Sequence, residues 1–163
     1  MHTGFGIAGL GELGGPAHGC RRGLHGGNGV RGCQIVRWPV TLLLDTQVML
    51  WWLLGDTRLR DDTRVLIASY RARVSVASVW EVAIKHRIGK LPVDAVSFRD
   101  ACLSTGATLL EIRDTHVIET GNLPGIHADP FDRLIIAQAR TEGLVAISSD
   151  LRWASYDLAL RRA

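Results

Sequence analysis

The sequence predicts an α/β fold built on a parallel β-sheet. Residues 42–44 are three consecutive leucines that stop at Asp45, and an uninterrupted apolar run of this length is typical of a strand covered on both faces. From Val40 onward, short apolar runs alternate with segments whose apolar residues recur at helical spacing. Because strands and helices that alternate along a chain form βαβ units with right-handed crossovers, these observations predict parallel strands separated by helices.

Four or five strands are expected in this sheet. They cover residues 42–44, 74–76, 108–112 and 144–147, and residues 158–160 are expected to add a last strand at the edge. Helices are expected at residues 47–54, 61–72, 79–87, 94–104, 114–120 and 130–142, with a further helical segment at 151–156. The Trp51-Trp52 pair of the first helix should be mostly buried.

Capping and turn residues mark several helix boundaries. Ser78 is a candidate N-cap for the helix at 79–87, and Gly89 follows that helix in the usual position. Asp129 is a candidate N-cap for the long helix, which has Pro130 at its first position and stops at Gly143. The helix at 79–87 and the residue after it carry apolar side chains at helical spacing, namely Trp80, Ile84 and Ile88.

The first 39 residues differ in composition from the rest of the chain. They hold 12 of the 18 glycines and show little apolar periodicity. We expect them to be disordered, because such a segment cannot bury enough surface to offset the entropy lost on ordering. The composition changes abruptly at Val40, and the valine codon GUG also serves as a start codon in bacteria. On this hypothesis residues 1–39 are a gene-calling artefact and residues 40–163 are the folded domain.

Charge and cysteine content exclude several classes of protein. The net charge of +3 falls on residues 1–39, because residues 40–163 carry 15 basic and 15 acidic side chains. The basic isoelectric point is therefore no sign of a nucleic-acid surface. Three scattered cysteines fit a reducing cytoplasm, and the His and Cys residues between positions 18 and 33 match no zinc-binding spacing. No segment has the apolar length of a membrane span or a signal peptide.

Four carboxylates occupy equivalent places in the predicted fold. Asp45 ends the first strand, Glu81 lies near the start of the helix after the second, Asp132 opens the long helix, and Asp150 follows the fourth strand. In a parallel sheet these places share one edge, so the four side chains can converge. Each has an ordinary alternative role as a helix cap, a partner of the helix dipole or a turn residue. Four such placements together favour a shared site.

Converging carboxylates require a cation, because they repel one another when all are ionised. No basic residue is an obvious partner for the whole group: Lys85 lies one turn after Glu81, and Arg133 faces away from Asp132 on its helix. Carboxylate and water ligands suit Mg²⁺ or Mn²⁺, whereas zinc normally draws in Cys or His. Such an ion activates water and stabilises charge on a phosphoryl group. The implied chemistry is phosphodiester hydrolysis.

Four segments of the chain share a recognisable pattern, namely residues 42–46, 74–85, 127–133 and 148–150. The most specific parts are Trp-Glu-x-Ala-x-Lys at 80–85 and Asp-Pro-Phe-Asp-Arg at 129–133. In this order the segments resemble the PIN domain family, and more narrowly the VapC-type toxins of bacterial type II toxin–antitoxin systems. The resemblance covers the chain from Val40 to about Ala163. Two features depart from the family: Gln47 stands where related toxins often have His, and the glycine-rich extension is foreign to it.

The resemblance implies a Rossmann-like, three-layer α/β/α sandwich and a Mg²⁺-dependent endoribonuclease, with Mn²⁺ as the alternative ion. It also implies a cytoplasmic protein that forms a homodimer and pairs with a cognate antitoxin. The catalytic and metal-binding positions carry over onto Asp45, Glu81, Asp132 and Asp150. Supporting positions are Thr46, Ser148 and Asp129. Independently of the resemblance, the basic residues beside Glu81 that are expected to contact RNA are Lys85, Arg87 and Lys90, and the alternative for this cluster is an ordinary solvated helix end.

The expected mechanism uses one or two Mg²⁺ ions held by Asp45, Asp132 and Asp150, with Glu81 direct or through water. His116 and His127 are expected to be structural or loop residues rather than general bases. The apolar segment 51–54 is a candidate groove for a dimer or an antitoxin.

The main alternative is a catalytically inert PIN-like module that only binds RNA or a partner protein. The presence of all four acids argues against it. A phosphatase of the haloacid-dehalogenase type would need a second aspartate where this chain has Gln47, and a response-regulator receiver would need an acid pair that is missing.

Overall fold

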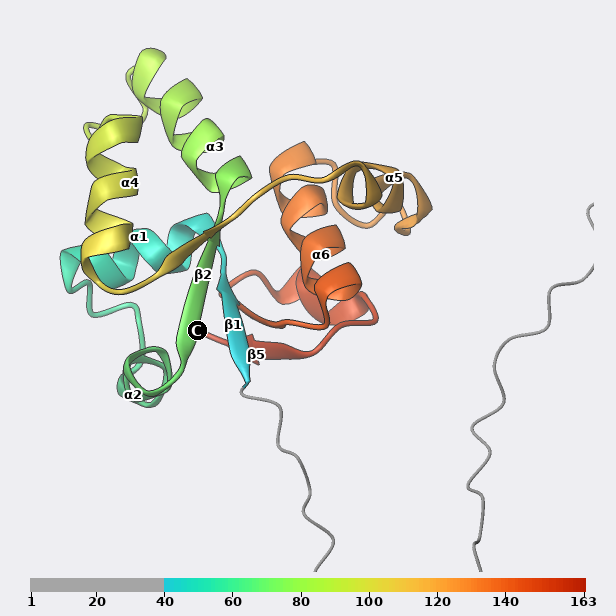
Figure 1. Ribbon diagram of the computed structural model, residues 1–163, viewed down its shortest axis with the longest axis horizontal. Coiled ribbons are helices and arrows are strands. Elements are labelled where there is room, and N and C mark those ends of the chain that lie inside the picture. The colour runs from blue at the N-terminus through green and yellow to red at the C-terminus, as the bar shows by residue number, and fades with distance from the viewer. Residues whose placement is uncertain (1–39) are drawn as a thin grey trace, which may run out of the picture. The chain divides into compact units, whose positions relative to one another are not determined.

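A five-stranded parallel sheet forms the centre of the part of the chain that this computed structural model describes, residues 40–163 (Figure 1). The spatial order of the strands is β3-β2-β1-β4-β5. Their bounds are β1 Thr41–Leu44, β2 Arg71–Ser75, β3 Thr108–Leu110, β4 Val145–Ser148 and β5 Leu160–Arg162. The predicted parallel sheet is thus confirmed. The expectations for residues 1–39, disorder and a false start, lie outside the described residues.

The register of the sheet aligns the ends of its three central strands. Leu44, the last residue of β1, pairs with Val74 of β2 on one side and with Ile147 of β4 on the other. The segments that follow these strands therefore leave the sheet side by side at its carboxyl edge, where ligands bind in open α/β folds.

Helices cover both faces of the sheet and make three layers. Their bounds are α1 Thr46–Leu54, α2 Asp61–Ser69, α3 Val76–Arg87, α4 Ala95–Ser104, α5 Asp114–Asn122, α6 Pro130–Glu142 and the 3₁₀ helix η1 Leu151–Ser155. Leu42 and Leu44 of β1 pack in one apolar cluster with α1, α2 and α4, whereas Leu43 packs with α6 in a second cluster on the opposite face. Figure 1 shows α1 and α4 on one side of the sheet and α6 on the other. The sandwich architecture is confirmed.

The boundary between α2 and β2 differs from the prediction. The helix expected to reach residue 72 ends at Ser69, because Arg71 and Ala72 already pair with Thr41 and Leu42 of β1. Pairing across the sheet outweighs the local helical pattern of these residues. The last strand is likewise shifted along the chain: β5 begins at Leu160 and pairs at the edge with β4.

The start of α3 also differs from the prediction. Ser75 is its N-cap, and its side-chain oxygen accepts a hydrogen bond of 2.9 Å from the backbone N–H of Ala77. Ser78, the predicted cap, lies buried inside the helix. The prediction failed because β2 ends one residue earlier than expected, so the turn into the helix falls on the first of two serines.

The apolar stripe of α3 and its C-cap faces outward. Trp80, Ile84 and Ile88 are 56%, 39% and 57% exposed, and the helix buries Ala77 and Val82 instead. In α1, by contrast, Trp51 is buried and Leu54 is 77% exposed. The longest helix between residues 40 and 163 has 13 residues, and none of the described helices meets the length and apolarity of a membrane span.

Candidate functional site

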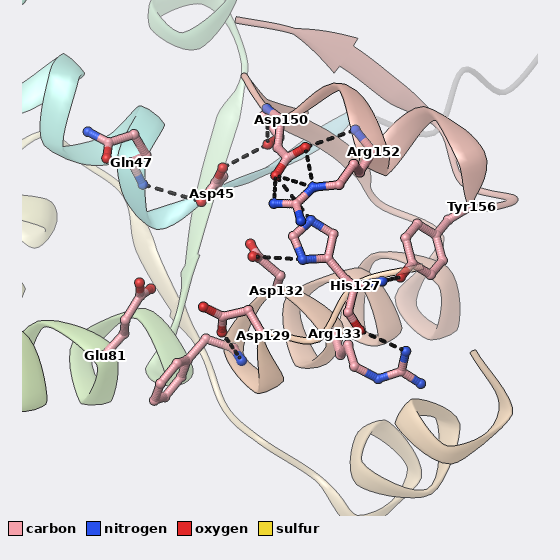
Figure 2. Close-up of polar contacts among 12 residues, drawn as sticks. Asp45, Gln47, Glu81, His127, Asp129, Asp132, Arg133, Asp150, Arg152 and Tyr156 are labelled. Carbon is pink, nitrogen blue, oxygen red and sulfur yellow. Dashed lines mark hydrogen bonds and ion pairs between the residues drawn. The ribbon is translucent and has the colours of Figure 1, made fainter. Parts of the chain in front are cut away.

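Four carboxylates from different elements face one pocket at the carboxyl edge of the sheet. Asp45 follows β1, Glu81 lies in the second turn of α3, Asp132 lies in the first turn of α6, and Asp150 comes two residues after β4. All four line an open pocket of about 230 Å³. Its other lining residues are Thr46, Gln47, Leu50, Lys85, Asp129 and Ser149. The structure therefore brings together the four acids that the sequence singles out (Figure 2).

Asp45 serves both as a helix cap and as a wall of the pocket. Its Oδ1 accepts a hydrogen bond of 3.2 Å from the N–H of Gln47 at the start of α1, and its Oδ2 accepts one of 2.7 Å from Ser148 Oγ. Burial raises the pKa of Asp45 above its ordinary value, although the bond from Ser148 opposes this shift. The cap and the site are thus compatible roles of one side chain, and Ser148 orients the carboxylate.

The carboxyl group of Asp132 lies in a strongly negative part of the pocket. Burial raises its pKa from 3.8 to about 7, and the negative charges of Asp45, Asp129, Glu81 and Asp150 add to the effect. A carboxylate with so high a pKa lies among more negative charge than its surroundings stabilise. The site therefore needs a proton or a cation at neutral pH.

Lys85 partly compensates for the negative charge. Its ammonium contacts the buried carboxylate of Glu81 one helical turn before it. Burial lowers the pKa of Lys85, but the hydrogen bond to Glu81 and the charges of Asp129 and Asp132 outweigh burial and raise it. Among the described residues expected to contact RNA, Lys85 lines the pocket, whereas Arg87 and Lys90 are exposed and do not.

Asp150 is held in its ionised form by Arg152, a residue that has no predicted role. Arg152 Nε lies 3.1 Å from both carboxylate oxygens, and Nη2 lies 2.6 Å from Oδ2. Hydrogen bonding to Arg152 lowers the pKa of Asp150 to about 2. Two acids of one pocket, Asp132 and Asp150, thus have pKa values pushed apart by their surroundings.

His127 is the second residue whose place in the site was missed. Its buried ring lies between two acids, with Nε2 3.1 Å from Asp150 Oδ2 and Nδ1 3.2 Å from Asp132 Oδ2. Figure 2 shows the ring joined to both carboxylates. The one available signal was its position five residues before Asp132, within a segment that carries the family resemblance. His116, by contrast, is buried against Glu142 of α6 and does not line the pocket.

Arg133 and Tyr156 hold the loop that carries His127. Arg133 donates to four backbone carbonyls, those of Thr120, Leu123, Pro124 and His127, at 2.5 to 3.3 Å. The hydroxyl oxygen of Tyr156 accepts a hydrogen bond of 2.8 Å from the N–H of His127. The position of His127 thus depends on a side chain of α6 and on a residue that follows η1.

The donor atoms of the pocket fit a divalent cation. Besides the carboxylates, Thr46 lines the pocket, and its buried Oγ1 finds no hydrogen-bond partner among residues 40–163. His127, Asp132 and Asp150 each offer a ligand atom within 4.8 Å of the others. An unpaired oxygen and mutually repelling carboxylates are what a hard cation would satisfy.

Replacing Arg152 by glutamine should strengthen the binding of a divalent cation to this pocket. The guanidinium contacts both oxygens of Asp150, so its removal frees lone pairs and removes a positive charge. We expect the dissociation constant for Mg²⁺ to fall about threefold to tenfold, or ~0.6–1.4 kcal/mol, in a calorimetric titration. Arg60→Gln is the matched control, because Arg60 pairs with Asp62 two residues away but outside this pocket. Unchanged or weaker binding by the Arg152 variant would contradict this role.

Comparison with known proteins identifies the family. The PIN domain model matches residues 42–158, and the chain therefore belongs to the PIN domain family. PIN domains are generally nucleases that use divalent metal ions. No curated protein matches the chain.

Solved structures of toxin–antitoxin complexes share the fold. A chain of VapBC2 from Rickettsia felis, bound to a DNA fragment of its promoter, aligns with a TM-score of 0.61 at 16% identity, over 76% of this chain and 98% of that chain. A chain of DNA-bound VapBC from Salmonella typhimurium gives 0.56 at 19% identity, over 76% and 97%. A chain of VapBC-1 from nontypeable Haemophilus influenzae gives 0.51 at 18% identity, over 76% and 98%.

Proposed function

We propose that this protein is a metal-dependent endoribonuclease that hydrolyses RNA phosphodiester bonds in the cytoplasm, as the toxin of a toxin–antitoxin pair. The observation that carries the proposal is the convergence of Asp45, Glu81, Asp132 and Asp150 on one open pocket. The raised pKa of Asp132 supports it, because this carboxylate is poised to exchange a proton for a cation. Membership of the PIN domain family supports the nuclease class.

Each residue has a distinct part in the proposed reaction. Asp45 and Asp132 would hold one or two Mg²⁺ or Mn²⁺ ions, with Glu81 and Asp150 as further ligands, direct or through water. A bound cation would polarise a water molecule for attack on the phosphorus and would neutralise the charge that develops on the phosphate. Ser148 keeps Asp45 in place through its hydrogen bond of 2.7 Å. Lys85, at the wall of the pocket, donates to a phosphate oxygen of the RNA backbone.

The antitoxin partner is proposed from the fold. The similar solved structures are VapBC toxin–antitoxin complexes, which supports a cognate antitoxin for this chain. Trp51 is buried in the core. The segment 51–54 therefore offers a partner mainly its later residues, above all the exposed Leu54. The outward stripe of Trp80, Ile84 and Ile88 offers further apolar surface, for the antitoxin or for a homodimer.

The test uses the full chain, wild type and Asp45→Asn, incubated with total bacterial RNA in Mg²⁺ or in EDTA. Asparagine is also a good N-cap, so the substitution preserves the start of α1 while it removes the negative charge. Wild type should produce discrete fragments in Mg²⁺ only, and the variant should cut at least about 100-fold more slowly.

Asp94→Asn is the matched control for this experiment. Asp94 caps α4 with its side chain, as Asp45 caps α1, but it does not line the pocket. This variant should cleave like wild type. If wild type and Asp45→Asn both bind RNA equally and neither cuts, the inert binding module replaces the nuclease as the better account.

A further inference from the structure

The ring of His127 is buried and both of its nitrogens face carboxylates. The residue is 3% exposed. Nε2 makes a contact of 3.1 Å with Asp150 Oδ2 in hydrogen-bonding geometry. Nδ1 lies 3.2 Å from Asp132 Oδ2, yet it has no hydrogen-bond partner within the described part of the chain. A buried nitrogen without a partner is unusual and calls for an explanation.

The contact with Asp150 determines which nitrogen of a neutral ring carries the hydrogen. Asp150 is ionised, because Arg152 contacts both of its oxygens, so it only accepts hydrogen bonds. His127 Nε2 is therefore the protonated nitrogen, and Nδ1 presents a lone pair. This lone pair and an oxygen of Asp132 are then two electron-pair donors 3.2 Å apart. Such an arrangement is stable only when a proton or a metal cation lies between or beside the two atoms.

A metal ion fits the spacing of these two atoms. Two ligands at about 2.1 Å from one ion, at roughly a right angle, lie about 3 Å apart. The contact of Nε2 is also consistent with metal binding at Nδ1, because a histidine that ligates a metal normally donates its other N–H to a carboxylate. Here that carboxylate is Asp150, which Arg152 holds in place. Asp132 in turn also lines the pocket and so links His127 to the open site.

We propose that His127 Nδ1 and Asp132 bind a divalent cation together, so that this centre has a nitrogen ligand and selects a first-row transition ion such as Mn²⁺ over Mg²⁺. Mg²⁺ prefers oxygen ligands alone, whereas an imidazole adds affinity for transition ions. The inference rests on the proposed function, which makes Asp132 a metal ligand. It adds which class of ion that same site prefers.

The test measures binding of the metal alone, without RNA. Full-length protein is titrated with Mn²⁺ and with Mg²⁺, and electron spin-echo spectra of the Mn²⁺ complex are recorded with natural and with ¹⁵N-labelled histidine. We expect Mn²⁺ to bind at least about tenfold more tightly than Mg²⁺. The spectra should show coupling to a directly bound histidine nitrogen.

Two variants test which histidine supplies the nitrogen ligand. His127→Gln should lose the coupling and bring the two affinities within about threefold of each other. His86→Gln, a change at an exposed histidine of α3, should keep both features. If wild type shows no nitrogen coupling, or if His127→Gln retains it, the inference is overturned. The wild-type spectrum decides the matter even if the His127 variant does not fold.

Failure of the histidine ligand and failure of the proposed function give different results in these experiments. RNA cleavage by a wild-type protein that lacks nitrogen coupling overturns the histidine ligand alone, and a proton shared between His127 and Asp132 then explains their contact. Coupling to His127 in a protein that cuts no RNA overturns the proposed function alone.

Discussion

Replacing Asp132 by asparagine should abolish metal-dependent RNA cleavage and, at the same time, stabilise the metal-free protein at neutral pH. The two effects have one cause. Burial and four neighbouring carboxylates raise the pKa of Asp132 to about 7, so its ionised form opposes folding. Asparagine has a similar shape and no charge. It therefore removes both the repulsion and the proposed metal ligand.

The size and the pH dependence of the stabilisation follow from the pKa shift. A rise from 3.8 to about 7 corresponds to at most ~4 kcal/mol, and relaxation of a side chain that is 25% exposed reduces the expected gain to ~1–3 kcal/mol. Because the folded state of wild type binds more protons than the unfolded state between about pH 4 and 7, its stability falls as the pH rises through that window. The advantage of Asp132→Asn should grow over the same window and level off above it.

Thermal unfolding in EDTA at pH 5 and pH 8 measures this advantage. At pH 8 the variant should melt ~4–10 °C above wild type, and Mg²⁺ should raise the melting temperature of wild type but not that of the variant. Asp157→Asn, at an exposed carboxylate outside the pocket, is the control for the loss of one negative charge. A variant that is less stable than wild type at pH 8 would contradict the electrostatic account, and one that still cleaves RNA would remove Asp132 from the mechanism.

The residue types near each boundary were sufficient to predict most helix ends, but not the bounds of the segments that pair in the sheet. Asp129 caps α6 and Gly143 ends it with a φ of 62°, as their residue types indicated. Arg71 and Ala72 continue a helical pattern in the sequence, yet they pair with β1. Whether these two residues form helix or strand depends on a strand about thirty residues earlier, which a short stretch of sequence around them does not contain.

The residues of the candidate site likewise include some that could be predicted from the sequence and some that could not. The acids were predictable because a parallel sheet fixes where the end of each strand lies, so residues far apart in sequence share an edge. His127 and Arg152 were not. His127 reaches the acids through a loop held by Arg133, and Arg152 matters through its contacts with both oxygens of Asp150. Neither contact follows from the spacing of residue types along the chain.

Replacing Arg133 by lysine should have the largest destabilising effect of the changes considered, ~2–3 kcal/mol, and should weaken metal binding as well. The guanidinium donates from two nitrogens to four backbone carbonyls, three in the loop between α5 and α6 and one, that of Thr120, in the last turn of α5. A lysine ammonium is a single point of charge and cannot reach the same set of acceptors. The carbonyls would lose their partners, and His127 would lose the fixed position between Asp132 and Asp150.

Urea and thermal unfolding of Arg133→Lys and Arg140→Lys test this role on one helix. Arg140 also projects from α6 but pairs with a single carboxylate, Glu119, so its replacement should cost less than ~1 kcal/mol. We expect the melting temperature of Arg133→Lys to fall by ~6–12 °C. If the two variants lie within ~0.5 kcal/mol of each other, the loop is held by its other contacts, chiefly the hydrogen bond to Tyr156. A drop in Mn²⁺ affinity that accompanies the loss of stability in Arg133→Lys alone would connect the loop to the metal centre, because Arg133 itself does not line the pocket.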